Sequence, residues 1–163
     1  MLTPDQEKWI SHLPIDKKVT IIPFDPTIPK KFAAIKQKIE QFLGDSAVVE
    51  HHGATSLGIS GQDEIDVYLP VSPSEFVPLT ISLEKIFGSP RSLYPLRRAR
   101  FVTIEDGKHI DVFSINKETD DWNNMVRFEN YLKTNTDYLN KYRQLKEEGN
   151  GLSIQEYYRR KLE

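Results

Sequence analysis

The sequence contains no cysteine, and none of its apolar runs is long. Disulfide bonds and thiolate metal sites are therefore excluded, and a chain without cysteine suits a reducing compartment. No segment approaches the roughly 20 apolar residues that span a bilayer, and the charged N-terminal segment lacks the apolar centre of a signal peptide. We therefore expect a cytoplasmic protein that has no membrane as a partner.

A surplus of charge of either sign is also missing. The 22 Lys and Arg residues nearly balance the 24 Asp and Glu residues, which leaves a formal net charge of -2. Because general binding to a nucleic acid depends on a broad positive field, we do not expect nucleic acid as a partner. A small anion such as a nucleotide needs only a local basic group, so the net charge does not exclude it.

The composition that remains is that of an ordinary globular protein. Of the 163 residues, 38% are hydrophobic and 28% are charged. This length is typical of one domain with a substantial core. We therefore predict a single domain that spans residues 1–163.

Hydrophobic periodicity, capping signals and turn residues divide the chain into helices and strands. The expected helices cover residues 4–12, 30–43, 78–87, 121–133, 137–148 and 153–163, and the expected strands cover residues 47–52, 64–69, 98–104 and 109–115. Asp106-Gly107 is a strong hairpin signal between the last two strands. The second helix carries four apolar residues at helical spacing, which we expect to be buried: Phe32, Ile35, Ile39 and Phe42.

Three of the expected strands bring polar groups to what we predict to be one sheet edge. Because strand side chains alternate between two faces, Glu64 and Asp66 point the same way, about 6 to 7 Å apart. Asp111, on a further strand, can bring a third carboxylate to the same place. Carboxylates gathered in this way repel one another unless they hold a cation, and a ligand set of oxygens suits Mg²⁺, or else Mn²⁺.

A glycine followed by small residues ends the strand before these carboxylates. The run Gly53-Ala54-Thr55-Ser56 allows the backbone to approach phosphate oxygens closely and offers amide and hydroxyl donors. Arg98 and Arg100 share a strand face and could bind phosphate bidentately. Each feature also has a plainer interpretation, because acidic pairs and arginines are typical of solvated strand faces and a short Gly-x-Thr-Ser run is common.

The order of these features is more specific than any one of them. A strand, a turn of glycine and small residues, an acid-x-acid strand, a helix and a strand with an aspartate follow one another. This order resembles that of the nucleotidyltransferases of the DNA polymerase beta type.

Longer matches resemble one family, GrpB. Residues 22–26, Ile-Pro-Phe-Asp-Pro, resemble its opening, and residues 49–56, Val-Glu-His-His-Gly-Ala-Thr-Ser, resemble its signature Glu-His-Ile-Gly-Ser-Thr-Ser. Residues 125–133 resemble its Phe-Arg-Asp-Tyr-Leu-Arg stretch, and residues 142–146 match its Tyr-x-x-Leu-Lys. The resemblance extends over about residues 21–162.

The resemblance implies an α+β fold, with a mixed β-sheet of nucleotidyltransferase type and helices packed mainly on one face. It implies transfer of a nucleoside monophosphate from an NTP to an unknown small-molecule or protein acceptor. Glu64, Asp66 and Asp111 would be the catalytic carboxylates and would also hold the metal cofactor, Mg²⁺ or Mn²⁺. The implied nucleotide-binding residues are Gly53, Ala54, Thr55, Ser56, Arg98 and Arg100.

Departures from the family pattern keep a second function open. Ala54 replaces a serine of the signature, which removes one phosphate donor. If Asp66 rather than Glu64 is the first carboxylate, Tyr68 takes the second place and the metal site is broken. Asp111, in contrast, restores an acid on the third strand. The alternative is a catalytically impaired module on the same fold that binds a nucleotide or another ligand.

The C-terminal helices contain many aromatic residues and lysines. We expect the aromatic residues to pack helix against helix. We expect Lys133, Lys141 and Lys146 to face solvent.

Overall fold

A computed structural model describes residues 2–163, within which seven helices and five strands are formed. The helices are α1 (Pro4–Ser11), α2 (Ile28–Leu43), α3 (Gly53–Ser56), α4 (Pro73–Phe87), α5 (Asp120–Thr134), α6 (Thr136–Glu148) and α7 (Ile154–Leu162). The strands are β1 (Glu50–His52), β2 (Glu64–Val71), β3 (Ser92–Tyr94), β4 (Arg98–Glu105) and β5 (Lys108–Asn116).

The five strands form one mixed sheet in the order β1-β2-β5-β4-β3. The central pair, β2 and β5, is parallel, and the other three pairs are antiparallel. The parallel pair requires a crossover, which α4 and the antiparallel strands β3 and β4 supply. The predicted α+β class with a mixed sheet is therefore confirmed.

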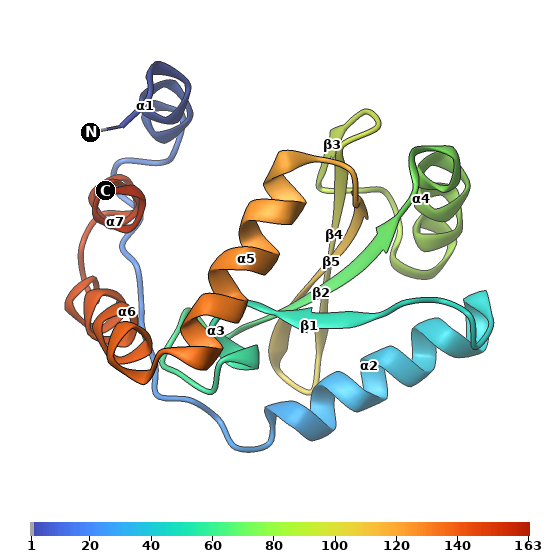
Figure 1. Ribbon diagram of the computed structural model, residues 1–163, viewed down its shortest axis with the longest axis horizontal. Coiled ribbons are helices and arrows are strands. Elements are labelled where there is room, and N and C mark those ends of the chain that lie inside the picture. Colours follow the sequence, from blue (N-terminus) through green and yellow to red (C-terminus); the bar gives the residue numbers. More distant parts are fainter. Residues whose placement is uncertain (1) are drawn as a thin grey trace.

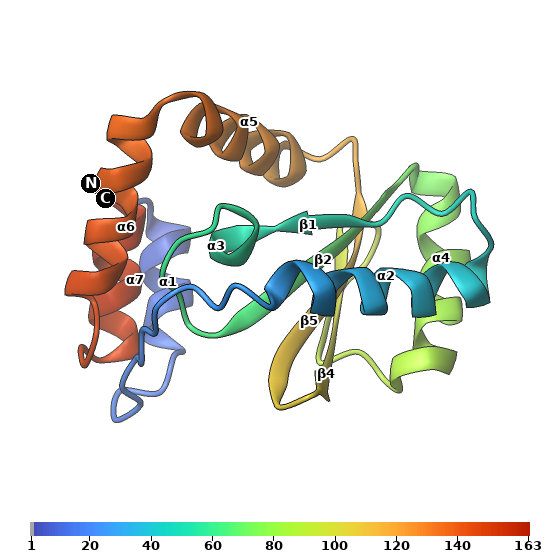
Figure 2. The same cartoon turned by 90° about the horizontal axis from the view of Figure 1, so that it is seen from below.

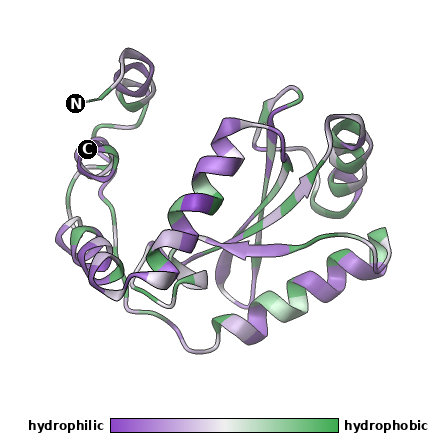
Figure 3. Ribbon diagram, viewed as in Figure 1, coloured by the Kyte–Doolittle hydropathy of each residue, from purple (hydrophilic) through white to green (hydrophobic). Residues whose placement is uncertain are grey.

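Alternation along the strands gives the sheet one apolar and one polar face. Ile65, Val67 and Leu69 of β2 are buried together with residues of α2 and α4 in the main core, as the sequence predicts. Figures 1 and 2 show α2 running alongside β1 and β2, and α4 at one end of the molecule. In Figure 3 the ribbon of α2 alternates between hydrophobic and hydrophilic residues, as expected for a helix with one buried side.

The helices α1, α6 and α7 gather at the end of the molecule opposite α4 (Figures 1 and 2). A second, smaller core joins α7 to the segment that follows α1, with Val19, Ile154 and Tyr157 buried at its centre. None of the helices within residues 2–163 has the length and apolarity that crossing a membrane requires.

Most predicted element boundaries differ from the observed ones by no more than three residues. The largest difference is in α4, which begins at Pro73 rather than residue 78 because Ser72 and Glu75 form a capping box ahead of it. Phe42 was predicted to be buried and is 53% exposed, whereas the neighbouring Leu43 packs on the core. Helical spacing therefore located the buried side of α2 but misassigned its last turn.

Candidate functional site

The register of β2 and β5 brings the predicted carboxylates to the polar face of the sheet. Asp66 lies directly opposite Asp111. Two residues earlier on both strands, Glu64 lies opposite His109.

Tyr68 stacks on the ring of Phe113, its partner on β5, with ring centroids 4.4 Å apart. The acidic residues beside Asp111 are therefore Glu64 and Asp66, and Tyr68 is part of an aromatic cluster.

Glu64, His109 and Asp111 form a close group, in which one ligand atom from each residue lies within 4.8 Å of the others. Asp111 is buried, and its two oxygens contact Arg100 Nη2 at 2.8 Å and His109 Nε2 at 3.0 Å. Strand alternation predicts that His109 shares a face with Asp111 at spacing two, and the structure brings the two side chains into contact. The group offers two carboxylates and an imidazole, which together suit Mn²⁺ as well as oxygen-preferring ions.

Glu64 and Asp66 lack the partners that Asp111 has. Among residues 2–163 neither side-chain carboxylate forms a hydrogen bond or an ion pair. Burial raises the pKa of Asp66 to about 7, and repulsion from Glu64 and Asp111 adds to the effect. Burial and the charge of Asp111 also raise the pKa of Glu64. Two unpaired, mutually repelling carboxylates would be stabilised by a cation.

Asp66 lies outside the close group because its carboxylate covers the Cα atom of Gly53. A Cβ at position 53 would overlap Asp66 Oδ2 and would come within 3.2 Å of its Cγ. Gly53 also has a φ of 81°, which L-residues with a side chain rarely adopt. The glycine of the turn is therefore required by the carboxylate beside it.

Replacing Gly53 with alanine is expected to displace the Asp66 carboxylate. Gly58→Ala is a matched control, because Gly58 has a φ of 68° but open space around it. In both variants alanine is forced to a positive φ, which costs about 1 kcal/mol or more. Any additional loss of stability in Gly53→Ala is therefore due to the overlap with Asp66. Urea denaturation should show Gly53→Ala to be the less stable of the two, and equal stability would contradict the close approach.

Three donors of the Gly53–Ser56 turn are already engaged within the protein. Gly53 N–H donates to Glu129 Oε1 at 2.6 Å, and the Thr55 hydroxyl donates to the carbonyl oxygen of Glu64 at 3.1 Å. The Ser56 hydroxyl donates to the carbonyl oxygen of Gly53 at 3.0 Å. Of the predicted phosphate-binding atoms in the turn, these three have partners already.

Glu129 is a buried residue that sequence reasoning did not single out. Its side chain extends from α5 to the turn and is only 4% exposed. Its Oε2 lies 2.9 Å from His52 Nδ1, and His52 Nε2 lies 2.8 Å from Glu50 Oε2. Burial of the His52 ring opposes its charge, but the hydrogen bonds to Glu129 and Glu50 outweigh this and raise its pKa.

The two predicted arginines have different surroundings. Arg100 pairs with Asp111, while its buried Nε has no partner among residues 2–163. The Arg98 guanidinium lies over the rings of Tyr94 and Phe113, at 5.4 and 5.6 Å from their centroids. Arg100 is therefore at the carboxylates, whereas Arg98 lies two residues further along β4, opposite Ile115.

Lys146 was expected to face solvent, and this prediction is wrong. The residue is 5% exposed, with its Nζ 3.2 Å from the Tyr157 hydroxyl. Burial and the neighbouring charge of Lys161 lower its pKa to about 8. The sequence pattern missed it because α6 is polar on most of its surface, and only the contact with α7 decides which side is covered.

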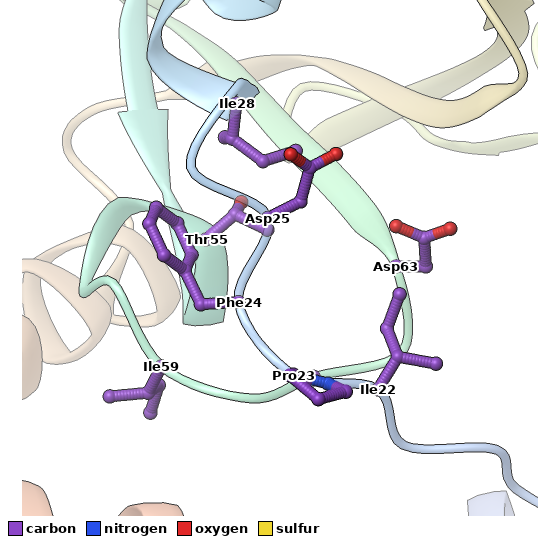
Figure 4. A pocket seen from close by; sticks show the side chains of 9 residues that line it. Ile22, Pro23, Phe24, Asp25, Ile28, Thr55, Ile59 and Asp63 are labelled. Atoms are coloured by element: carbon purple, nitrogen blue, oxygen red, sulfur yellow. The ribbon is translucent and has the colours of Figure 1, made fainter.

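A small, shallow hollow lies beside the Gly53–Ser56 turn, away from the three candidate carboxylates. It is lined by the segment before α2 and the segment between α3 and β2, with residues such as Phe24, Thr55 and Ile59 (Figure 4). Asp25 and Asp63, at its rim, both pair with Lys108. None of the three candidate carboxylates lines this hollow, so we assign it no part in the site.

The fold and the site define an α+β protein with carboxylates on the polar face of a mixed sheet. The sequence model of the GrpB protein family matches residues 18–163. The chain therefore belongs to the GrpB family.

Two known proteins illustrate the relationship. UPF0157 protein BH1888 of Halalkalibacterium halodurans is 31% identical over 150 residues, which are 86% of this chain and 74% of that protein. The crystal structure of conserved protein GrpB from Enterococcus faecalis has a TM-score of 0.61 at 20% identity, covering 78% of this chain and 81% of that one. The second similarity supports the fold alone.

Proposed function

We propose that this protein is a metal-dependent nucleotidyltransferase. It would move a nucleoside monophosphate from an NTP to a hydroxyl or phosphate group of a small molecule or protein. An acceptor oxygen bonds to the α-phosphorus, the bond from that phosphorus to the bridging oxygen breaks, and pyrophosphate leaves. The observation that carries this proposal is the parallel register that sets Asp66 opposite Asp111 and leaves two carboxylates without a protein partner.

The residues present fit a divalent cation. Glu64, Asp66 and Asp111 would hold Mg²⁺ or Mn²⁺, and His109 offers a nitrogen ligand beside them. When bound, the cation supplies charge stabilisation to the phosphate oxygens. Asp111 would orient the acceptor hydroxyl and accept its proton, and Arg100 fixes the position of the Asp111 carboxylate.

A second proposal, a nucleotide- or ligand-binding module without catalysis, rests on a separate observation. Three donors of the Gly53–Ser56 turn are bound internally, and Arg100 already neutralises Asp111. These contacts leave fewer groups free to stabilise a transferring phosphoryl group.

Titration calorimetry with Mn²⁺, alone and then with ATP, tests the cation site. Wild-type protein is expected to bind Mn²⁺, and ATP should strengthen binding because its phosphate oxygens add ligands. Glu64→Gln should weaken Mn²⁺ binding at least about tenfold, in the range seen when the surroundings of a metal are altered. Glu105→Gln, a change on the same sheet away from the carboxylates, should bind as wild type does. Equal heats in wild type and Glu64→Gln would remove the basis for both the site and the enzyme.

Transfer is measured separately with ATP labelled at its α-phosphate. The label should move to an acceptor in a mixture of hydroxyl- and phosphate-bearing metabolites and proteins, and Glu64→Gln should abolish the movement. Binding of Mn²⁺ and ATP without any transfer would favour the binding module instead.

A further inference from the structure

Lys146 is a buried cation that lacks an anionic partner. Its Nζ lies 5.4 Å from the ring centroid of Tyr142 and 6.0 Å from that of Tyr157, and donates to the Tyr157 hydroxyl. Among residues 2–163 it forms no ion pair with a carboxylate. An ammonium group that is removed from water costs free energy unless it is paired, so its position calls for an anion that the chain itself does not supply.

Lys161 of α7 repeats this arrangement beside it. Its Nζ lies 5.5 Å from the ring centroid of Tyr158 and likewise has no carboxylate partner among the described residues. The charge of Lys161 lowers the pKa of Lys146, as expected for a like charge in its neighbourhood. Two unpaired ammonium groups, one from α6 and one from α7, are therefore held near each other on tyrosine rings.

The charges of the two lysines are felt at the carboxylates, although neither lysine forms an ion pair with them. Both act on Asp66 electrostatically, and Lys161 also acts on Glu64. Figures 1 and 2 show α6 beside α3, at the end of β1 where Asp66 covers Gly53. The helix that carries Lys146 therefore lies next to the end of β1, where the unpaired carboxylate of Asp66 covers Gly53.

We propose that Lys146, together with Lys161, binds a phosphate group of the substrate on the α6–α7 side of the carboxylates. The proposal rests on the function proposed above and assigns its phosphate subsite to residues outside the Gly53–Ser56 turn. Because the Gly53 N–H and the hydroxyls of Thr55 and Ser56 are engaged, a phosphate group at the carboxylates has fewer donors in the turn and gains from partners elsewhere. Lysine ammonium groups bind phosphate as compact point charges, and the Tyr157 hydroxyl next to Lys146 is a further donor.

The test is calorimetric binding of tripolyphosphate in the presence of EDTA, so that it does not depend on the metal site. Lys146→Met is expected to weaken binding at least about tenfold, which corresponds to the loss of one charge-assisted hydrogen bond. Lys146→Arg should retain more of the affinity than Lys146→Met, because it keeps the charge. Lys161→Met should also weaken binding.

Lys141→Met is the matched control. Lys141 lies on the same helix, with its Nζ 5.0 Å from the ring centroid of Tyr138, but it is exposed. Its substitution should leave tripolyphosphate binding unchanged. Lys146→Met is expected to fold, because methionine keeps the length of the side chain and removes an unpaired buried charge; its thermal melt confirms this.

The outcomes separate this inference from the proposed function. If Lys146→Met binds tripolyphosphate as tightly as wild type does, or if Lys141→Met weakens it equally, the subsite is overturned, whatever Mn²⁺ and ATP do. If the loss is specific to Lys146 and Lys161, the subsite stands even if no label transfer is found. Ribose 5-phosphate is the second probe: a Lys146-dependent affinity for it above that for tripolyphosphate assigns the subsite to a phosphorylated acceptor rather than to the NTP.

Discussion

Substitution of Glu129 by alanine is expected to lower the free energy of unfolding by about 3 to 5 kcal/mol, the range found when one partner of a buried charged pair is removed. The Glu129 carboxylate accepts from Gly53 N–H at 2.6 Å and contacts His52 Nδ1 at 2.9 Å. Alanine leaves the Gly53 N–H and His52 Nδ1 without these partners, whereas His52 Nε2 keeps its contact with Glu50 at 2.8 Å. Because these contacts join α5 to the end of β1, the loss should also loosen the position of Gly53.

Urea denaturation at pH 6 measures this effect, with Asn130→Ala as the control. Asn130 is the next residue of α5, is exposed, and its side chain forms no hydrogen bond within the described chain. Asn130→Ala should change the free energy of unfolding by no more than about 0.5 kcal/mol. A loss below about 1 kcal/mol for Glu129→Ala would contradict the arrangement.

Glu129→Gln separates the charge from the hydrogen bonds. Glutamine can still accept from Gly53 N–H, but it cannot stabilise a charged His52. In wild type the pKa of His52 is raised above 6.5, so its contribution to stability is complete below about pH 6.5 and is lost as pH rises through the folded-state pKa. Glu129→Gln should reduce this pH dependence.

The second large effect is expected at Asp66, and it has the opposite sign. Asp66→Asn should stabilise the metal-free protein at pH 8. Its folded-state pKa of about 7, compared with 3.8 for an unperturbed aspartate, corresponds to about 4 kcal/mol, and solvent screening of a side chain that is not fully buried reduces our expectation to about 2 kcal/mol.

The pH dependence follows from the raised pKa. Below pH 3.8 the Asp66 carboxyl is protonated in both the folded and the unfolded chain, so it does not lower the stability of the fold. As pH rises the unfolded chain loses this proton first, so the destabilisation grows and is complete above about pH 7. The difference in stability between Asp66→Asn and wild type should therefore be small at pH 4 and largest at pH 8.

Thermal melts at pH 4 and pH 8, with EDTA or with Mn²⁺, test this prediction. Mn²⁺ should raise the Tm of wild type at pH 8 and should have less effect on Asp66→Asn, because binding to the folded state alone stabilises it. Asp45→Asn, a change of an exposed aspartate in a turn, is the control. A variant that melts like wild type under all four conditions would show that Asp66 is a solvated strand residue.

Local patterns predicted much of this molecule because they report properties of single elements. Period-two alternation placed Glu64 and Asp66 on the face opposite Ile65, and the same rule placed Asp111 on one face of β5. The glycine-rich turn and the family motifs indicated where β1 ends. These features depend on residues close in sequence, so they are readable without a structure.

The partners of those residues depend on contacts between distant segments. Alternation alone does not say that Asp66 pairs with Asp111, because the register of β2 and β5 is set by the packing of their apolar face. It also does not show that Arg100 crosses from β4 to neutralise Asp111. Sequence reasoning therefore named the three carboxylates but could not tell which two lack partners.

The buried charges of the C-terminal half were decided by tertiary structure alone. Glu129 and Lys146 lie on helices whose sequences are polar on most sides, so periodicity gave no reason to distinguish them from their exposed neighbours. They are buried because α5 docks on His52 and Gly53 and because α6 packs against Tyr157 of α7. Local sequence determined that these segments are helices; the contacts between helices, turn and sheet determined which of their charges leave water.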